Sequence, residues 1–276
     1  MKKTVLITGA SSGIGNAAAK RFARNGWNAV ATMRSPDVAQ DLVRLDDMLV
    51  TRLDLQDHDS ICKAIEAGIA RFGKIDALIN NAGFSLFGIF EMLPREKIRE
   101  QFDVNVLGVM DVTRAMLPHF RKNKGGLIIN ISSRAGLVAL PMISLYCATK
   151  YALEGFSESL AYELASQNII VKIIEPSGGV TSTNFSERVG KERVQDTLSD
   201  YNDFVARTSA AFAGMRSARK TSADEVAQVI HDAATDGTNR LRYFTGEDSG
   251  GFVKAKREMS EPDYINFMRS RFLPQT

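Results

Sequence analysis

A tyrosine and a lysine stand four residues apart, at Tyr146 and Lys150, within the run YCATK. The ALEGFSESLAYEL that follows has a helical pattern, so both side chains should project from one face of a helix. At about 4 Å and an effective dielectric of about 20, the ammonium would stabilise a phenolate by about 4 kcal/mol, or roughly three pKa units. The pair therefore predicts a tyrosine pKa near neutrality, which suits a general acid–base for ketone reduction.

Two polar residues upstream could complete such a site. Ser133 ends the run NISS after an expected strand, where its hydroxyl could donate a hydrogen bond to a substrate oxygen. A serine that caps a turn is the alternative interpretation, and Asn105 within VNVLG is equally compatible with a structural role. The prediction of a catalytic site therefore depends on the joint arrangement of these residues.

A glycine-rich turn, TGASSGIG, follows an expected strand and precedes an expected helix. Gly9, Gly13 and Gly15 are the positions where the backbone could approach a pyrophosphate closely, and the helix N-terminus favours its negative charge. The alternative is a structural turn capped by serines. The flanking strand and helix favour a dinucleotide site.

The residues at the end of the second expected strand indicate which dinucleotide would bind. In dinucleotide folds an acidic residue there binds the free 2′-hydroxyl of NAD. Here the strand ends in Thr32, Met33 and Arg34, and the planar guanidinium of Arg34 could pair with a 2′-phosphate. NADP(H) is therefore predicted in preference to NAD(H), with a solvated surface arginine as the alternative.

Short β-branched runs alternate with stretches of helical period, which predicts a parallel sheet. The seven expected strands span residues 4–8, 29–32, 49–53, 77–80, 127–131, 171–174 and 241–244. One expected helix has an apolar face at Ile61, Ala64, Ile65, Gly68, Ile69 and Phe72. Another should open with a capping box formed by Ser222 and Glu225.

Right-handed crossovers between parallel strands place helices on both faces of the sheet, the doubly wound α/β architecture of the Rossmann fold. We expect residues 1–276 to form a single such domain with seven parallel strands. Residues 183–220 depart from the alternation and are interpreted as a substrate lid, because long excursions at this sheet edge are usually functional. The tail at 247–276 is not expected to be a separate domain.

Composition limits the possible partners. A net charge of +3 with no basic run argues against nucleic-acid or membrane-surface binding. No apolar segment has membrane-spanning length and the apolar run near the start is too short for a secretory signal, so a cytoplasmic location is expected. Cys62, Cys147 and the three histidines lack the spacing of a metal site, so no metal is expected.

Together these motifs resemble the short-chain dehydrogenase/reductase (SDR) family, over nearly the whole chain from Thr4 to about Gly246. TGASSGIG is similar to the family's cofactor turn, LDL at 53–55 to its adenine contact, and NNAG at 80–83 to its fourth-strand motif. Asn105, Ser133, Tyr146 and Lys150 match the catalytic tetrad, and Tyr146 follows Ser133 by the family's 13 residues.

The resemblance implies a role for each member of the tetrad. Tyr146 would donate or accept the proton and Ser133 would hold the substrate oxygen. Lys150 would lower the tyrosine pKa and bind the nicotinamide ribose, while Asn105 would hold a water that relays protons. The implied cofactor contacts are Gly9, Ser11, Ser12, Gly13, Ile14, Gly15, Arg34, Asp54, Leu55, Asn81, Ala82, Gly83, Tyr146, Lys150, Pro176 and Thr181.

One segment departs from the family pattern. After the sixth strand the family usually has Pro-Gly followed shortly by Val-x-Thr, whereas this chain reads EPSGGVTSTNF. The register slips by a residue or two, so the sequence leaves open whether Thr181 or Thr183 meets the nicotinamide carboxamide.

The function that the resemblance implies is the interconversion of a secondary alcohol and a ketone by hydride transfer. The alternatives are a catalytically silent NADP-binding sensor or regulator, which loss of Tyr146 or Lys150 would have favoured, and an epimerase or dehydratase, which needs a larger substrate domain. Apolar residues near the site, at Phe84, Leu86, Phe87, Leu137 and Met142, suggest a lipophilic substrate or ordinary core packing. The resemblance also implies a homodimer or homotetramer.

Overall fold

The computed structural model describes residues 2–43, 45–177, 180–181, 198–215, 221–248 and 250–273. Within them, seven parallel strands form one sheet in the order β3-β2-β1-β4-β5-β6-β7. The strands are β1 (Thr4–Thr8), β2 (Asn28–Met33), β3 (Met48–Arg52), β4 (Ala77–Asn80), β5 (Gly126–Ile131), β6 (Ile169–Pro176) and β7 (Arg242–Thr245). All seven strands expected from the sequence are confirmed, because nearly continuous apolar runs suit a sheet buried on both faces.

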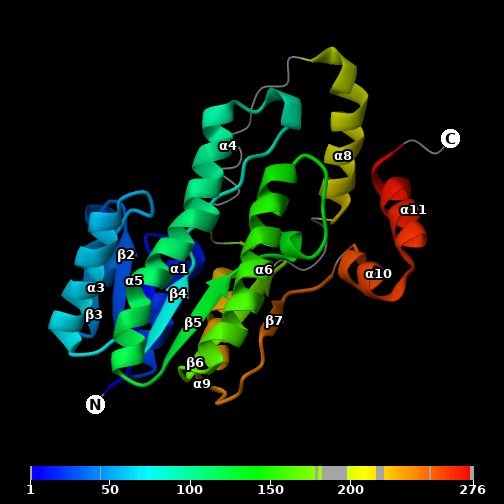
Figure 1. Cartoon of the computed structure of the whole chain (residues 1–276). Helices are drawn as coiled ribbons and strands as arrows, with labels where there is room; N and C mark the ends of the chain where they lie inside the picture. Colours follow the sequence, from blue (N-terminus) through cyan, green and yellow to red (C-terminus); the bar gives the residue numbers. More distant parts are fainter. Residues whose placement is uncertain are drawn as a thin grey trace.

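Helices cover both faces of this sheet (Figure 1). One face carries α1 (Gly13–Arg24) and α9 (Ala223–Thr235), and the other carries α3 (His58–Phe72), α5 (Gly108–Lys122) and α6 (Ser144–Ala165). The doubly wound fold predicted from the sequence is therefore confirmed. Among the described helices, none combines the length and apolar character that crossing a bilayer requires.

Two local sequence signals are confirmed in the helices. Ser222 and Glu225 form the capping box of α9, with the Glu225 amide donating to Ser222 Oγ at 3.1 Å and the Ser222 amide donating to Glu225 Oε2 at 2.7 Å. The buried side of α3 includes Ile61, Ala64, Ile65 and Gly68. Gly68 has to be small there, because a Cβ would lie 2.9 Å from Cγ2 of Val30.

The strand order reverses between β1 and β4, which places a crevice at their carboxyl ends. Thr8 ends β1 and Asn80 ends β4, and the strands are paired from Val5 opposite Ala77 to Ile7 opposite Ile79. The glycine-rich turn and the NNAG motif follow these two strands directly, so the fold brings together two motifs that are some seventy residues apart.

The structure describes only part of the segment interpreted as a lid. Phe185, with the other residues of 182–197 and 216–220, lies outside the described residues. Residues 198–215 include α8 (Asn202–Met215), which lies above the sheet in Figure 1. From α8, the Phe212 ring lies 6.2 Å from that of Phe87, after β4, and 5.8 Å from that of Phe272.

The C-terminal tail forms α10 (Phe252–Glu258) and α11 (Glu261–Phe272) at the side of the domain (Figure 1). Their apolar residues share a cluster with Val138, which follows β5, and with Phe212 of α8. The tail therefore packs on the segment after Ser133 and on the described part of the expected lid.

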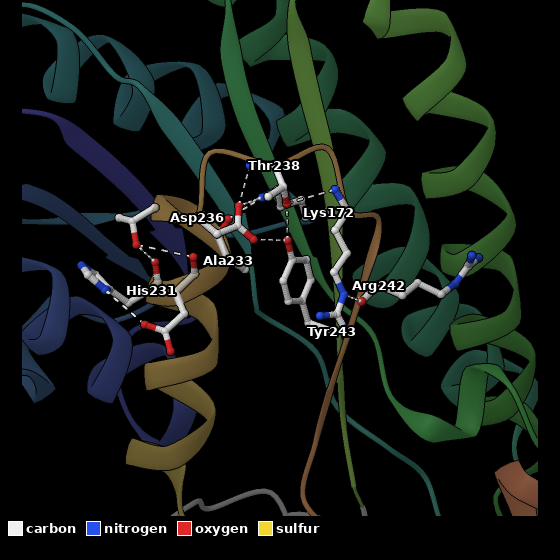
Figure 2. Close-up of polar contacts among 10 residues, drawn as sticks. Lys172, His231, Ala233, Asp236, Thr238, Arg242 and Tyr243 are labelled. Atoms are coloured by element: carbon white, nitrogen blue, oxygen red, sulfur yellow. Dashed lines mark hydrogen bonds and ion pairs between the residues drawn. The ribbon is translucent and has the colours of Figure 1, made fainter.

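A buried lysine connects β6, α9 and β7 near the ends of those elements remote from the crevice (Figure 2). Lys172 is 3% exposed in its side chain and donates to Asp236 Oδ1 at 2.6 Å and to the Ala233 carbonyl oxygen at 2.7 Å. Tyr243 also donates to Asp236. Although desolvation opposes ionisation, the hydrogen bonds from Lys172 and Tyr243 hold the pKa of Asp236 well below its usual range.

We expect Asp236→Asn to lower the free energy of unfolding by about 1–3 kcal/mol at pH 7, because the buried Lys172 ammonium loses its charged acceptor. The carboxylate contributes fully above about pH 4. That contribution disappears as the pH falls through the lowered pKa of the folded state, so the difference between the proteins should vanish in strong acid. Urea unfolding at several pH values measures this.

The matched control is Asp232→Asn, because Asp232 lies one turn earlier on the same helix and is 60% exposed in its side chain. It should leave stability within about 0.5 kcal/mol of the parent. Equal effects of the two substitutions would contradict a specific contribution from the Lys172–Asp236 pair.

Candidate active site

The glycine-rich turn is braced by the segment that follows β4. Asn81 donates from Nδ2 to the carbonyl oxygens of Thr8, at 2.9 Å, and Gly9, at 3.1 Å. In return the Thr8 hydroxyl accepts hydrogen bonds from the backbone amides of Asn81 and Ala82, at 3.0 and 3.1 Å. These contacts fix the NNAG segment against the turn at the crevice.

The turn has the shape of a cradle for a pyrophosphate. Gly9 and Gly13 have φ values of +70° and +59°, which favour glycine. A Cβ on Gly9 would lie 2.8 Å from Cα of Ala82, and one on Gly15 would lie 2.5 Å from Asn81 Nδ2. The turn can therefore pack this closely against the NNAG segment only because these positions have no side chain.

Helix α1 begins directly at this cradle. Its N-cap residue, Ser12, makes no side-chain capping hydrogen bond, and the first turn contains no acidic residue. The leading amides and the helix dipole therefore favour an anion there. Ser11 and Ile14 flank these positions in sequence. The residues present fit the diphosphate of a nicotinamide dinucleotide.

The expected adenine contacts lie along the neighbouring strand ends. The Ala10 amide donates to the Thr32 carbonyl oxygen at 2.9 Å, so the end of β2, with the exposed Arg34 just beyond it, lies beside the turn. Asp54 follows β3 and is partly exposed. The Leu55 side chain is only 7% exposed and packs in the core, which leaves mainly its backbone to face a ligand.

Ser133 and Tyr146 come together from two different elements. Ser133 follows β5 and precedes the 3₁₀ turn η4 (Arg134–Gly136), where its hydroxyl accepts from the Ala135 amide at 3.1 Å. The same hydroxyl hydrogen-bonds with Tyr146 in the first turn of α6. Ser133 thus caps a turn and contacts the tyrosine, so the two interpretations of its sequence position are compatible.

Asn105 lies in a π-helical turn, η3 (Asp103–Leu107), between α4 (Arg95–Phe102) and α5. Its Nδ2 donates to the Phe84 carbonyl oxygen at 2.8 Å and to Thr149 Oγ1 at 3.1 Å, and its Oδ1 accepts from the Phe84 amide at 3.0 Å. The side chain therefore joins the segment after β4 to α6. π-Helical turns are rare and frequently occur at functional sites.

Lys150 completes the cluster beneath the tyrosine. Its Nζ lies 5.6 Å from the centroid of the Tyr146 ring and donates to the Ile131 carbonyl oxygen at 2.8 Å. A Cβ on Gly83 would lie 3.1 Å from Asn105 Oδ1 and 4.0 Å from Lys150 Nζ. The structure therefore brings Asn105 of η3 and Lys150 of α6 together next to Gly83, and Tyr146 of α6 contacts Ser133, which follows β5.

The expectation of a tyrosine pKa near neutrality is not met in this geometry. Burial raises the pKa of Tyr146 to about 12, and the hydrogen bond with Ser133 opposes that rise. Burial also lowers the pKa of Lys150 to about 8, although the charge of the Glu154 carboxylate acts to raise it. A value near neutrality would require strong attraction from an ammonium about 4 Å from the phenol oxygen, whereas Lys150 Nζ lies 5.6 Å from the centroid of the ring. Desolvation outweighs that attraction because both groups are buried.

The residues expected at the nicotinamide end are described only in part. Pro176 ends β6, and Thr181 pairs with the segment before α9, where its amide donates to the Thr221 carbonyl oxygen at 2.8 Å. Thr183 lies outside the described residues. The choice between the two threonines stays a prediction.

The apolar residues suggested for a substrate pocket divide into two groups. Leu86 and Met142 are 1% and 6% exposed, so their side chains belong to the core. Phe87 is partly exposed and contacts Phe212 of α8, and Phe84 is also partly exposed. The aromatic side chains after β4, rather than Leu86 or Met142, are available to a substrate.

Sequence reasoning missed several contacts in this region. Thr149, which is fully buried and accepts from Asn105, gave no motif signal. Nothing in VNVLG distinguishes a π-helical turn from an ordinary helix. Glu154 could have been found, because it follows Lys150 at the spacing that had already singled out Tyr146. The described residues contain no group of three His, Cys, Asp or Glu side chains that could hold a metal ion.

Doubly wound folds with this crevice and this cluster of polar residues define a class of dinucleotide-dependent oxidoreductases. The short chain dehydrogenase family model matches residues 3–193. An uncharacterized oxidoreductase of Schizosaccharomyces pombe is 40% identical over 218 residues, which cover 78% of this chain and 89% of that protein. A 3-ketodihydrosphingosine reductase of Bacteroides thetaiotaomicron is 36% identical over 204 residues, covering 74% of this chain and 73% of that protein.

Solved structures agree with these relatives. A short-chain dehydrogenase from Streptomyces avermitilis superposes with a TM-score of 0.83 at 30% identity, covering 98% of this chain and 97% of that one. A 3-ketoacyl-(acyl-carrier-protein) reductase from Brucella melitensis, complexed with NADH, has a TM-score of 0.73 at 26% identity and covers 88% and 96%. The protein ElxO, with NADP bound, has a TM-score of 0.73 at 25% identity and covers 92% and 100%. The chain belongs to the short-chain dehydrogenase/reductase family of oxidoreductases.

Proposed function

We propose that this protein is an NADP(H)-dependent oxidoreductase that interconverts a secondary alcohol and a ketone, with Tyr146 as the general acid–base. The observation that carries the proposal is the contact between Ser133 and Tyr146 beside the buried Lys150. The bound cofactor would supply or accept the hydride at its nicotinamide ring. Its diphosphate would lie in the cradle of Gly9 to Gly15, at the N-terminus of α1.

In the direction of reduction, the side chains of this site move and hold a proton. The Ser133 hydroxyl donates a hydrogen bond to the ketone oxygen and orients it towards Tyr146. The Tyr146 hydroxyl transfers its proton to that oxygen as the carbonyl carbon receives the hydride, so an alcohol and a phenolate form. The Lys150 ammonium stabilises the phenolate. A pKa of about 12 keeps Tyr146 protonated at neutral pH, so the proton is present, and its transfer depends on the Lys150 ammonium stabilising the phenolate as it forms.

Asn105 is proposed to support the return of the proton. Its side chain has protein partners at both Nδ2 and Oδ1, in Phe84 and Thr149, so it fixes the segment after β4 against α6. A water that relays protons to Lys150 would therefore have to use the main chain near Asn105.

The preference for NADP(H) is supported by Arg34. Its side chain is exposed just beyond β2, beside the cradle, where a 2′-phosphate would require a cation. The residues that end β2 and follow it, Thr32, Met33, Arg34 and Ser35, include no carboxylate that would bind a free 2′-hydroxyl.

A lipophilic ketone is proposed as substrate. The partly exposed aromatic rings of Phe84 and Phe87, with Phe212 of α8 against Phe87, provide apolar area beside the tetrad. One relative is named a 3-ketodihydrosphingosine reductase and one similar structure a 3-ketoacyl-(acyl-carrier-protein) reductase, and both names specify a keto group, which is compatible with a ketone substrate. Residues 183–220 would cover this substrate as a lid.

Assembly as a homodimer or homotetramer is also proposed. Leu107, Tyr151 and Tyr162 are 51%, 42% and 72% exposed next to and along α5 and α6, where a second copy could cover them. Sedimentation velocity of the purified chain tests this. A cytoplasmic location stays a prediction, which fractionation of cells that express the tagged chain would test.

The test of function is a continuous absorbance assay of NADPH and NADH oxidation with a panel of ketones of increasing chain length. We expect NADPH oxidation that depends on the ketone, with kcat/KM rising as the substrate becomes more lipophilic. NADPH binding without turnover of any ketone would count against the proposed reaction, and faster turnover with NADH would count against the proposed cofactor.

A further inference from the structure

Two buried carboxyl groups lie behind the helix that carries Tyr146 and Lys150. Glu154, on α6, is 5% exposed and Glu175, on β6, is not exposed at all. Both contact the same atom of Arg242 on β7, whose Nε lies 3.0 Å from Glu154 Oε2 and 3.5 Å from Glu175 Oε1. Two buried carboxyl groups thus meet at one guanidinium.

Three carboxyl groups compete for the guanidinium of Arg242, and Glu175 has the longest contact with it. Arg242 also pairs with the more exposed Glu158, its Nη2 lying 2.5 Å from Glu158 Oε2. Neither oxygen of Glu175 accepts a hydrogen bond from the described residues. An ionised carboxylate without donors is costly to bury, so the structure favours a neutral Glu175. Burial, together with the Glu154 carboxylate, raises the pKa of Glu175 to about 8.

The same cluster faces the proposed catalytic residues. Glu154 follows Lys150 by one helical turn, and no described carboxylate forms a salt bridge with Lys150. Burial lowers the pKa of Lys150, and the Glu154 charge acts against that decrease. A Cβ on Gly136 would lie 2.9 Å from Glu154 Cγ and 3.0 Å from the Lys150 carbonyl oxygen. The turn after Ser133 therefore rests directly on Glu154.

We propose that Glu175 carries a proton while Glu154 is ionised, and that the negative charge of Glu154 positions the Lys150 ammonium and keeps it charged. Both are positioning residues, since neither would touch substrate or cofactor. The other charged groups that face the pair are Arg242 of β7, Glu158 of α6, Arg134 of η4 and Arg257 of α10. The effect of this negative charge on catalysis rests on the proposed role of Lys150. The electrostatic coupling between the charge and Lys150 does not depend on that role.

The coupling is measured directly on Lys150 in the cofactor-free protein. Lysine labelled with ¹³C at Cε reports the ionisation of each ammonium by NMR, and Lys150→Arg identifies the Lys150 signal. We expect Glu154→Gln to lower the midpoint of the Lys150 titration by about one to two pH units, because a carboxylate one turn away is lost. Glu154→Asp, which keeps the charge, should restore most of the shift.

Glu158→Gln is the matched control, because Glu158 lies one turn further along α6 and pairs with the same Arg242 but is 43% exposed in its side chain. It should leave the Lys150 midpoint nearly unchanged. Equal shifts in Glu154→Gln and Glu158→Gln, or no shift in either, would overturn the proposal.

The proton on Glu175 is measured on the parent protein, so this test does not depend on whether the Glu154 variant folds. An infrared carbonyl band of a protonated carboxyl group should persist at pH 6.5, well above the range in which glutamates ionise, and disappear near pH 8. Glu175→Gln should remove the band. A parent protein without this band would refute the protonation of Glu175. Because neither measurement uses turnover, failure of the proposed function would leave both results interpretable.

Discussion

Tyr146→Phe is expected to lower kcat about 10²- to 10⁴-fold in the NADPH assay, because the variant keeps the ring but loses the proton donor. The hydroxyl hydrogen-bonds with Ser133, and no other described phenol lies in that position. NADPH binding, measured by fluorescence titration, should change little, since the cradle of Gly9 to Gly15 is formed by other elements. A loss confined to kcat would assign the hydroxyl to the chemical step.

Tyr151→Phe is the matched control for this substitution. Tyr151 lies on the same helix, but it is 42% exposed and donates its hydroxyl to the Leu137 carbonyl oxygen. It should retain activity within a few-fold of the parent. If Tyr146→Phe turned over a ketone as fast as Tyr151→Phe, the assignment of Tyr146 as general acid would be wrong.

Arg34→Ala is expected to weaken NADPH binding about 10- to 100-fold, which corresponds to the loss of one or two charge-assisted hydrogen bonds to a phosphate. Affinity for NADH should be almost unchanged, because NADH lacks the 2′-phosphate. The measurement is the dissociation constant for each dinucleotide, determined at two salt concentrations, since an exposed ion pair weakens as ionic strength rises.

Arg24→Ala serves as the control, because Arg24 is also exposed but lies at the far end of α1 from the cradle. Its loss should affect both cofactors equally and slightly. An Arg34→Ala variant that binds NADPH as well as the parent does would show that Arg34 is only a solvated surface residue.

Periodicity and turn chemistry were enough to predict the framework of the fold. The seven strands, the doubly wound arrangement and the capping box of Ser222 and Glu225 are all local patterns, and each is confirmed. The location of the glycine-rich turn was also predictable, because the residues on either side of it determine a strand and a helix.

Resemblance to a family supplied what local patterns could not. Nothing in the spacing of Asn105, Ser133 and Tyr146 shows that β5, η3 and α6 converge. Only the family's motifs group these three residues with Lys150. The choice between Thr181 and Thr183 depends on a departure from that family pattern, and the structure describes only Thr181.

By itself the sequence determined the elements, the glycine cradle and the types of side chain that could do chemistry, because these depend on neighbours along the chain. Only the tertiary structure decided how those side chains ionise, since burial depends on residues far apart in sequence. Burial raises the pKa of Tyr146 to about 12 instead of leaving it near neutrality, and it raises the pKa of Glu175 to about 8. Each group loses water when α6 and β6 pack together. The meeting of Glu154 and Glu175 at Arg242 has the same origin, because three elements separated in the chain must first assemble around it.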